Sequence, residues 1–149
     1  MKKILLAWLL LLVLSVPSLA AEKELAGIFF PLPEGWLVAE EYKAGGGDHM
    51  ILDNGDSSVL LSVSVSSDGG TSARDFVTVL APVLGATDEP VEHEGQYAFP
   101  IRQEDQEGFC FLTQGGGRFL VLCVMGDMEQ ALPIVEGMRC PAAPALVIK

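Results

Sequence analysis

FCFLTQGGGRFLVLCVM, residues 109–125, is the stretch that decides the fold. Residues 109–114 and 119–125 are two apolar runs, and residues 115–118 form a glycine-rich turn between them. Both runs carry apolar side chains on both of their alternating faces, which is typical of strands that are covered on each side. Strands joined by so short a turn pair antiparallel. The stretch therefore predicts a central antiparallel hairpin with other layers packed on both of its faces.

More strands are expected before this hairpin. Residues 59–66 alternate between an apolar face and a face of mostly hydroxyl side chains, so the sheet has a less buried side there. Asn54-Gly55 predicts a two-residue hairpin turn, because both residues tolerate positive φ. Residues 44–48 are expected to form a flexible loop, and residues 87–94 an acidic connector. The other expected strands are residues 27–33, 36–42, 49–53 and 97–102.

Two helices are predicted, one before the acidic connector and one after the central hairpin. Ser72 and Asp75 resemble a capping box at the start of the first helix, and Gly85 is suited to its C-cap. Asp127 and Gln130 make a similar start for the second helix. Each helix contains a proline, which removes a helical hydrogen bond and should distort the helix. The side chains expected to face the sheet are Phe76, Val79, Leu80, Val83 and Leu84 in the first helix, and Met128, Leu132, Val135 and Met138 in the second.

The order of these elements predicts an α+β domain. Short connections favour antiparallel neighbours, so we expect an antiparallel sheet of about six or seven strands with two helices packed on it. Residues 27–140 are expected to form this single domain, and no internal repeat is visible. Residues 21–26 are expected to be a loose charged leader, and residues 141–149 a flexible tail.

The first twenty residues have the pattern of a secretory signal peptide. Lys2 and Lys3 precede an apolar run at residues 4–14, and Ser18 and Ala20 are the small residues before a cut after Ala20. The alternative, an uncleaved membrane anchor, needs about 20 apolar residues, and this run is too short. No cysteine near the cut could carry a lipid anchor. We expect export to the bacterial periplasm, with full secretion as the alternative, and no membrane span after cleavage.

The exported chain is strongly acidic. The full sequence has 9 basic and 20 acidic residues, and removal of Lys2 and Lys3 leaves 7 basic residues and a formal net charge of −13. Such a surface repels the phosphates of nucleic acids and anionic lipids. Binding to nucleic acid is therefore not expected. A cationic partner is compatible with this charge, and a solvated acidic surface without a partner is the alternative.

The start of the predicted domain resembles a known family. FFPLPEGW at residues 29–36 contains a Pro-x-Gly-Trp pattern at Pro33, Gly35 and Trp36, and a hairpin, a helix, a three-strand meander and a closing helix follow. This order resembles the PsbP-like superfamily, which includes photosystem accessory proteins, a Ran-binding nuclear factor and DcrB-type bacterial envelope proteins. The resemblance covers most of residues 27–139 and implies a small accessory or binding domain without catalytic residues. Pro133 and the three cysteines depart from the pattern.

The three cysteines are Cys110, Cys123 and Cys140, and an oxidising compartment permits disulfides between them. If residues 115–118 form a four-residue turn, Cys110 and Cys123 lie directly opposite each other. Cross-strand Cα atoms about 4.5–5.5 Å apart suit a disulfide. The alternatives are that both cysteines are small core residues or that Cys140 competes as a partner. The sequence contains no C-x-x-C redox motif.

No catalytic, metal-binding or cofactor-binding motif is recognisable in the sequence. His49 and His93 each follow or precede a carboxylate, but neighbours on one strand point to opposite faces, so neither pair is a dyad. Residues 53–56 lack the spacing of a calcium-binding EF-hand loop. The glycine runs lack the Lys-Ser/Thr of a phosphate-binding loop. We therefore expect exposed histidines, no cofactor and no metal.

Three functions remain open from the sequence. The favoured hypothesis is a non-enzymatic accessory or binding protein of the envelope that recognises another protein or a small ligand. The alternative is an enzyme with a dispersed, hydrolase-like site that uses His49 or His93, which requires an imidazole with polar partners. The third hypothesis is a redox-active or metal-binding thiol protein.

Overall fold

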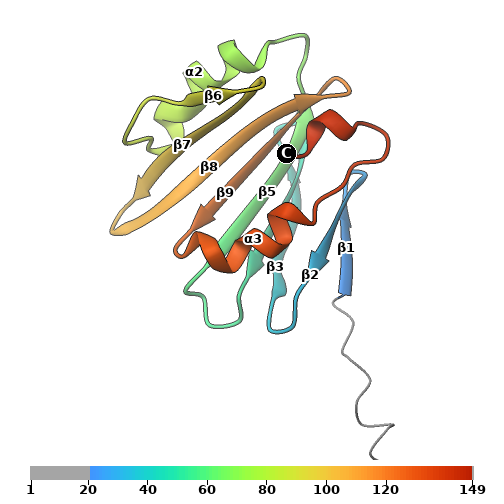
Figure 1. Ribbon diagram of the computed structural model, residues 1–149, viewed down its shortest axis with the longest axis vertical. Coiled ribbons are helices and arrows are strands. Elements are labelled where there is room, and N and C mark those ends of the chain that lie inside the picture. Colours follow the sequence, from blue (N-terminus) through green and yellow to red (C-terminus); the bar gives the residue numbers. More distant parts are fainter. Residues whose placement is uncertain (1–20, 149) are drawn as a thin grey trace, which may run out of the picture.

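The computed structural model describes residues 21–148, so the predicted signal peptide at residues 1–20 lies outside the described part. Within this part the chain forms a seven-stranded antiparallel sheet, a separate two-stranded sheet and two α-helices (Figure 1). In sheet order, the large sheet consists of β3 (Leu37–Ala44), β4 (Gly47–Asp53), β5 (Leu60–Ser67), β9 (Arg118–Met125), β8 (Gln106–Gly115), β7 (Gln96–Gln103) and β6 (Val91–His93). The small sheet pairs β1 (Ala21–Leu25) with β2 (Ile28–Leu32). The predicted α+β class is confirmed.

The central hairpin has the predicted register, with Cys110 opposite Cys123. Its strands, β8 and β9, lie inside the large sheet, where β9 has a layer on each face and β8 is covered on one face and only partly on the other. The β1–β2 hairpin, α3 (Met128–Glu136) and the 3-10 helix η1 (Pro144–Leu146) cover one face, which we call the α3 face. Helix α2 (Ala73–Leu84) covers part of the other face, which we call the α2 face.

Each face of the sheet has a hydrophobic core of its own. On the α3 face, Leu61 and Leu122 pack with Ile134, and all three are fully buried. On the α2 face, Val77 packs into a smaller cluster with Phe99 and other side chains of β7 and β8. Burial of each such side chain contributes about 1.5–3 kcal/mol to folding. In Figure 1, α3 crosses the front of the sheet and α2 lies at its β6–β7 end.

The α2 face is left partly open over β3, β4 and β5. Ser62, Ser64 and Ser66 lie on this face and are half-buried, whereas Leu61 and Val63 on the other face are fully buried. The hydrophobic cluster beneath α2 is built from side chains of β7, β8 and β9. The helix therefore does not cover β3, β4 or β5. The predicted less buried side of the sheet is therefore confirmed.

The connection between β4 and β5 differs from the predicted two-residue turn. β4 ends at Asp53, and the loop that follows is closed by the Asp53 carboxylate, which accepts hydrogen bonds from the backbone N–H groups of Gly55 (2.8 Å) and Ser57 (3.0 Å). The Ser57 hydroxyl and the Gly55 N–H lower the pKa of Asp53, because they stabilise its charged form. Asn54 also bonds across the loop to Ser58. These local side-chain bonds favour a wider loop over the Asn-Gly turn.

The tight two-residue turn lies instead between β3 and β4, where the sequence predicted a flexible loop. Ala44 pairs with Gly47, and Gly45 and Gly46 have φ values of 59° and 77°. A turn that matches the twist of a hairpin needs positive φ at both central residues, and glycine adopts it without steric cost. The glycine run is therefore structural rather than flexible.

The predicted loose leader is wrong for residues 21–25, which form β1. Leu25 is 4% exposed and belongs to the core of the α3 face. Glu22 and Glu24 lie on the exposed side of the strand, and Glu22 forms an ion pair with Arg139 at 3.0 Å. Backbone hydrogen bonds to β2 hold β1 in place, and the buried Leu25 side chain anchors it in the core.

The predicted flexible tail is also wrong for residues 141–148. Helix η1 lies in the tail, and Leu146 is fully buried in the core of the α3 face. The hydroxyl of Thr113 on β8, itself 1% exposed, donates a hydrogen bond to the Leu146 carbonyl. The tail is ordered because it fills the core and satisfies a buried polar group.

The buried side of α2 is the predicted one only in part, since Phe76 and Leu84 pack against the core beneath the helix as expected. Val79 and Val83 are 66% and 77% exposed, and the residues closest to the sheet are Ala73, Val77 and Ala81. The small alanines allow the helix axis to approach the sheet, and the larger side chains flank this line of contact. The helix boundaries are as predicted, with Ser72 as the N-cap and Gly85 as the C-cap.

Cys110 and Cys123 are joined by a disulfide in the structure, with their Cα atoms 4.2 Å apart. The bond connects β8 to β9 on the α2 face. Cys140 is free and buried, and the guanidinium of Arg118 lies 3.5 Å from its sulfur.

We predict that the Cys110–Cys123 bond stabilises the domain modestly. It spans 13 positions in the chain, and closing a loop of that length contributes about 3 kcal/mol at most in the chain-entropy model. Urea unfolding followed by the fluorescence of Trp36 should show a lower midpoint after reduction of the wild-type protein. The Cys110→Ala/Cys123→Ala variant serves as the control, because its midpoint should not respond to reductant. Equal midpoints for oxidised and reduced wild type would contradict the prediction.

Thr113→Val is predicted to destabilise the domain by about 1–3 kcal/mol, because it leaves the buried Leu146 carbonyl without its donor. Thr78→Val is the matched control, since the Thr78 hydroxyl bonds the Arg74 carbonyl on an exposed helix surface. Its effect should stay within about 0.5 kcal/mol. Urea midpoints of the two variants measure the difference, and similar losses would show that the tail contact contributes nothing.

Candidate binding site

A groove lies between α2 and the connector that leads from α2 to β6. It has a volume of about 760 Å³, and its lining is more apolar than polar. Val77, Ala81 and Pro82 of α2 form one wall, and Tyr97 of β7 closes the groove toward the sheet. Ligand sites in proteins are commonly of this size and composition. The groove can therefore hold several side chains of a ligand.

The N-terminal end of α2 is fixed to the sheet through Gln114 of β8. Its side-chain carbonyl accepts the backbone N–H of Ala73 at 2.9 Å, and its amide donates to Asp68 at 2.8 Å and to the Thr71 carbonyl at 2.9 Å. The Gly70 N–H and the Gln114 amide lower the pKa of Asp68. This network binds the helix start to a central strand.

The C-terminal end of α2 is fixed by backbone contacts with β7. The Gly85 carbonyl accepts the Arg102 N–H at 2.9 Å, and the Thr87 N–H donates to the Pro100 carbonyl at 3.0 Å. Gly85 has φ of 83°, and a Cβ there would lie 2.5 Å from the Arg102 carbonyl oxygen, so only glycine fits this approach. With both helix ends fixed, the groove is formed before any ligand arrives.

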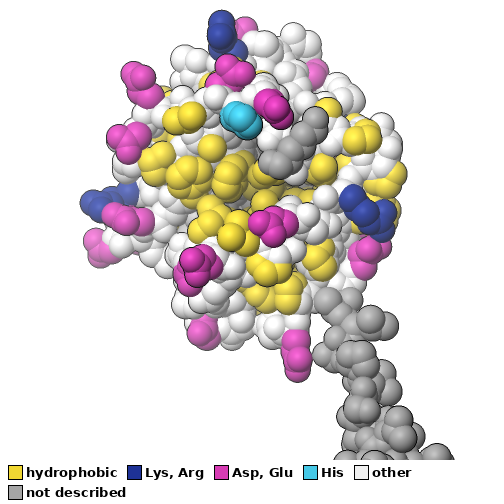
Figure 2. Space-filling model, in the orientation of Figure 1, with side chains coloured by type: hydrophobic (Ala, Val, Ile, Leu, Met, Phe, Trp, Pro, Cys, Tyr) yellow, Lys and Arg dark blue, Asp and Glu magenta, His cyan; other side chains and the backbone are white. Residues whose placement is uncertain are grey.

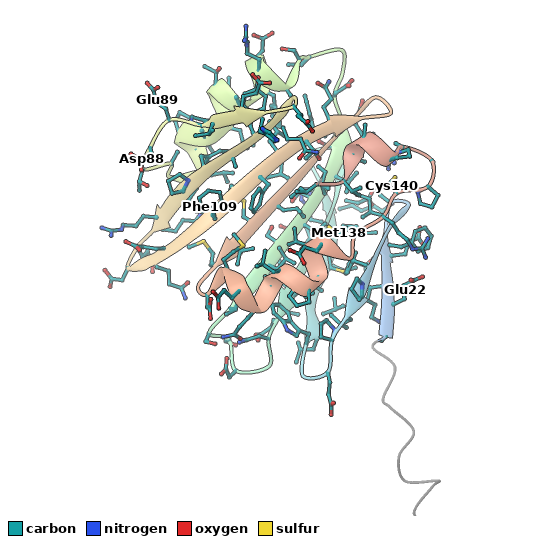
Figure 3. The ribbon with its side chains drawn as sticks, in the orientation of Figure 1. Glu22, Asp88, Glu89, Phe109, Met138 and Cys140 are labelled. Atoms are coloured by element: carbon teal, nitrogen blue, oxygen red, sulfur yellow. A yellow bond between two sulfur atoms is a disulfide. The ribbon has the colours of Figure 1, made fainter. Side chains whose placement is uncertain are left out.

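The rim of the groove on the connector is acidic. Asp88 and Glu89 line it, and Figure 3 shows both side chains projecting from the connector at the edge of the molecule. None of the ion pairs found in residues 21–148 includes either carboxylate. Arg74 of α2 is the one basic residue in the lining. The rim therefore offers two carboxylates to a cationic ligand beside an apolar wall.

A second apolar surface lies on the α3 face, over β7 and β8. Figure 2 shows hydrophobic side chains gathered there, with acidic side chains scattered around them. Phe109 and Phe111 are half-buried, and their rings are 5.3 Å apart. Phe109 is labelled in Figure 3, where it lies on β8 to one side of α3. Neither phenylalanine lines the groove beside α2.

The two histidines lie far from each other in the sheet and neither lines the groove. His93 is exposed on β6. His49 lies on β4, its Nδ1 is 2.8 Å from the Ser64 hydroxyl, and its Nε2 is 3.0 Å from the Ala44 carbonyl oxygen. A carbonyl only accepts, so Nε2 carries the proton and Nδ1 of the neutral ring accepts from Ser64. His49 thus has polar partners, one of which is a hydroxyl that it could deprotonate.

The cysteines do not form an accessible thiol site. Cys110 and Cys140 are 0% and 2% exposed, and Cys123 is half-buried. Across residues 21–148, no three His, Cys, Asp or Glu side chains are placed to hold a metal ion together. In the same residues, no helix is both long enough and apolar enough to span a membrane.

Sequence reasoning missed the groove. It identified residues 87–94 as an acidic connector, and that acidity is the signal that pointed to Asp88 and Glu89. The walls could not be found, because the sequence did not identify Val77 and Ala81 as the inner side of α2 and Tyr97 reaches the groove only through the sheet register.

No family model matches the sequence, and no curated protein matches it. Among solved structures, the chain is similar to cyanobacterial PsbP (CyanoP) from Synechocystis sp. PCC 6803. The TM-score is 0.54 and the sequence identity 14%, over 85% of this chain and 95% of that chain. At this identity the likeness shows the fold alone. The chain has a PsbP-like α+β fold, in agreement with the resemblance found in the sequence.

Proposed function

We propose that the protein is an exported, non-enzymatic binding protein whose α2 groove takes an extended segment of another envelope protein. The observation that carries this proposal is the groove itself, which is preformed, apolar at Val77, Ala81 and Pro82 of α2, and acidic along the connector. A segment with alternating apolar and basic side chains matches both walls.

The charge of the chain supports a basic ligand. Asp88 and Glu89 are exposed and stand outside the ion pairs of the described residues, so neither has to give up a partner. The net charge of −13 that remains after signal cleavage adds a long-range attraction for cations. Exposed ion pairs contribute about 0.2–1 kcal/mol each, so the apolar wall supplies most of the affinity and the carboxylates supply selectivity.

The location and the family are part of the same proposal. The signal-peptide pattern at residues 1–20 supports export to the periplasm, with secretion as the alternative. The PsbP-like fold is compatible with an accessory role, and the Pro33, Gly35 and Trp36 pattern supports a relationship to DcrB-type envelope proteins.

The proposed ligand class can be tested with two matched peptides, one of alternating Lys and Leu and one in which Glu replaces Lys. NMR titration of the mature protein should shift amide signals of α2, the connector and Tyr97 with the Lys peptide, and should not shift them with the Glu peptide. Asp88→Asn/Glu89→Gln should weaken binding of the Lys peptide roughly three- to tenfold.

The matched control is Glu104→Gln/Asp105→Asn, an acidic pair in the β7–β8 turn that does not line the groove. It removes the same charge and should leave the affinity nearly unchanged. Equal loss in both double variants would assign the effect to net charge. Equal binding of both peptides, or shifts outside the groove, would refute the proposed ligand class.

A hydrolase-like enzyme is the second candidate function, favoured by one observation. The Ser64 hydroxyl donates to His49, and the Ala44 carbonyl holds the imidazole in the tautomer that can accept a proton. The pair lies on the open hydroxyl surface of the sheet and does not line the groove.

We predict that Ser64 is not a catalytic nucleophile. Wild type and Ser64→Ala should hydrolyse p-nitrophenyl acetate at equal rates and should label equally with a fluorophosphonate probe. His49→Gln serves as the second variant, since it keeps a polar side chain at the same position. Turnover or labelling that disappears in both variants would establish the enzyme and overturn the non-enzymatic proposal.

A further inference from the structure

β3 is the outermost strand of the large sheet and is exposed on both of its faces. Every residue of β3 except Val38 is exposed, so neither the β1–β2 hairpin nor α2 covers it. The opposite edge, β6, has three residues and follows Pro90, which lacks an N–H. An unpaired edge strand offers its backbone groups to another strand. β3 is therefore the edge of the large sheet that can take a further strand.

Pairing of β3 with a further strand is hindered only in the first part of β3. A bulge between Val38 and Glu40 interrupts the register there, and bulges prevent edge-to-edge contact. From Glu40 to Ala44 the pairing with β4 is regular. The available segment is therefore residues 40–44.

The register identifies which backbone groups of β3 point outward. Ala44 and Gly47 flank the two-residue turn and form a hydrogen-bonded pair, so Tyr42 also bonds to β4. The residues between them, Glu41 and Lys43, direct their N–H and C=O groups to the open edge. Two residues of opposite charge thus present the free backbone groups.

We infer that β3 pairs antiparallel with β3 of a second copy of this chain, centred on Tyr42. In this register Glu41 of each copy lies opposite Lys43 of the other, and both pairs exchange their backbone hydrogen bonds. The sequence Glu41-Tyr42-Lys43 is self-complementary only when it is reversed, as an antiparallel two-fold contact requires. The result is one continuous sheet across two molecules.

Other registers are disfavoured by charge. A two-fold contact centred on Glu41 places two carboxylates opposite each other, and one centred on Lys43 places two ammonium groups opposite each other. Like charges in direct cross-strand positions are destabilising, whereas opposite charges are stabilising. The contact centred on Tyr42 is the register that uses the outward backbone groups without such repulsion.

The side chains are already arranged for this contact. Tyr42 is 46% exposed, and its ring is stacked on His49 with the centroids 5.0 Å apart. The Lys43 ammonium lies 3.2 Å from Asp48, and its side chain is 87% exposed, so it can also reach Glu41 of the second copy. Tyr42 meets its symmetry mate in a non-hydrogen-bonded pair, the closer type of cross-strand pair.

Cysteine cross-linking tests the register directly. Tyr42→Cys should form a disulfide-linked dimer under mild oxidation, because its Cα atoms lie about 4.5 Å apart across the two-fold axis. Position 43 is more exposed than position 42, but Lys43→Cys lies two residues out of register with its symmetry mate and should stay monomeric. Cross-linking of both variants to the same extent, or of neither, would overturn the proposed pairing.

Charge reversal tests the contact in solution without cysteines. A contact of this size falls below about 1,000 Å² and is weak, so wild type is measured by sedimentation up to about 1 mM. The self-association of Glu41→Lys and of Lys43→Glu should weaken roughly tenfold, since each replaces two attractive pairs by repulsive ones. The double variant should recover it. A monomeric wild type, or a double variant no better than the single ones, would refute the inference.

Discussion

The fold depends on one constraint, which is that β8 and β9 carry large apolar side chains on both faces. Leu122 and Val124 point to the α3 face and Cys110 and Leu112 to the α2 face, and all four are fully buried. A sheet with such a centre needs a layer on each side to remove this surface from water. The chain supplies the layers from three separate segments, which are the β1–β2 hairpin, α2 and α3 with η1.

The two layers are unequal, and the exposed features of the molecule follow from that difference. A helix with its side chains is about 10–12 Å wide and α2 contacts chiefly β7 and β8, while seven strands spaced about 4.8 Å apart span roughly 29 Å. α2 therefore covers one end of its face and leaves the other end to solvent. The serines of β5 suit the open end, and the connector that returns from α2 to β6 encloses the groove at the covered end.

Sequence periodicity was sufficient to predict the pairing and the two sides of a strand wherever its faces were chemically distinct or both fully apolar. The register of Cys110 with Cys123 and the serine side of β5 followed from it. Periodicity did not predict the structure where local hydrogen bonds or tertiary packing determine it. The Asp53 carboxylate converts the Asn54-Gly55 turn into a wider loop, which a turn propensity does not include. Buried Leu25 and Leu146 also fix the first and last segments of the described residues, which sequence periodicity alone did not predict.

The candidate site was harder to predict than the fold, for a physical reason. A groove forms between segments that are separate in the sequence. Its walls at Val77, Tyr97 and Glu89 come close only through tertiary packing. The side of α2 that faces the sheet could not be identified from hydrophobicity, because the contact line uses Ala73 and Ala81 and leaves Val79 and Val83 exposed. The larger Phe76 and Leu84 pack at the sides of this contact line, and Val79 and Val83 point to solvent.

The groove and the β3 edge lie at opposite ends of the seven-stranded sheet. Pairing of two copies through β3 therefore leaves both grooves open, one at each end of the continuous sheet. Two weak sites held at a fixed spacing bind a ligand with two basic segments more tightly than either site alone, provided the ligand can span them. A modest groove and a weak sheet-edge contact are each insufficient for stable capture of a partner. Under the proposed function, this arrangement favours ligands with two basic segments over ligands with one.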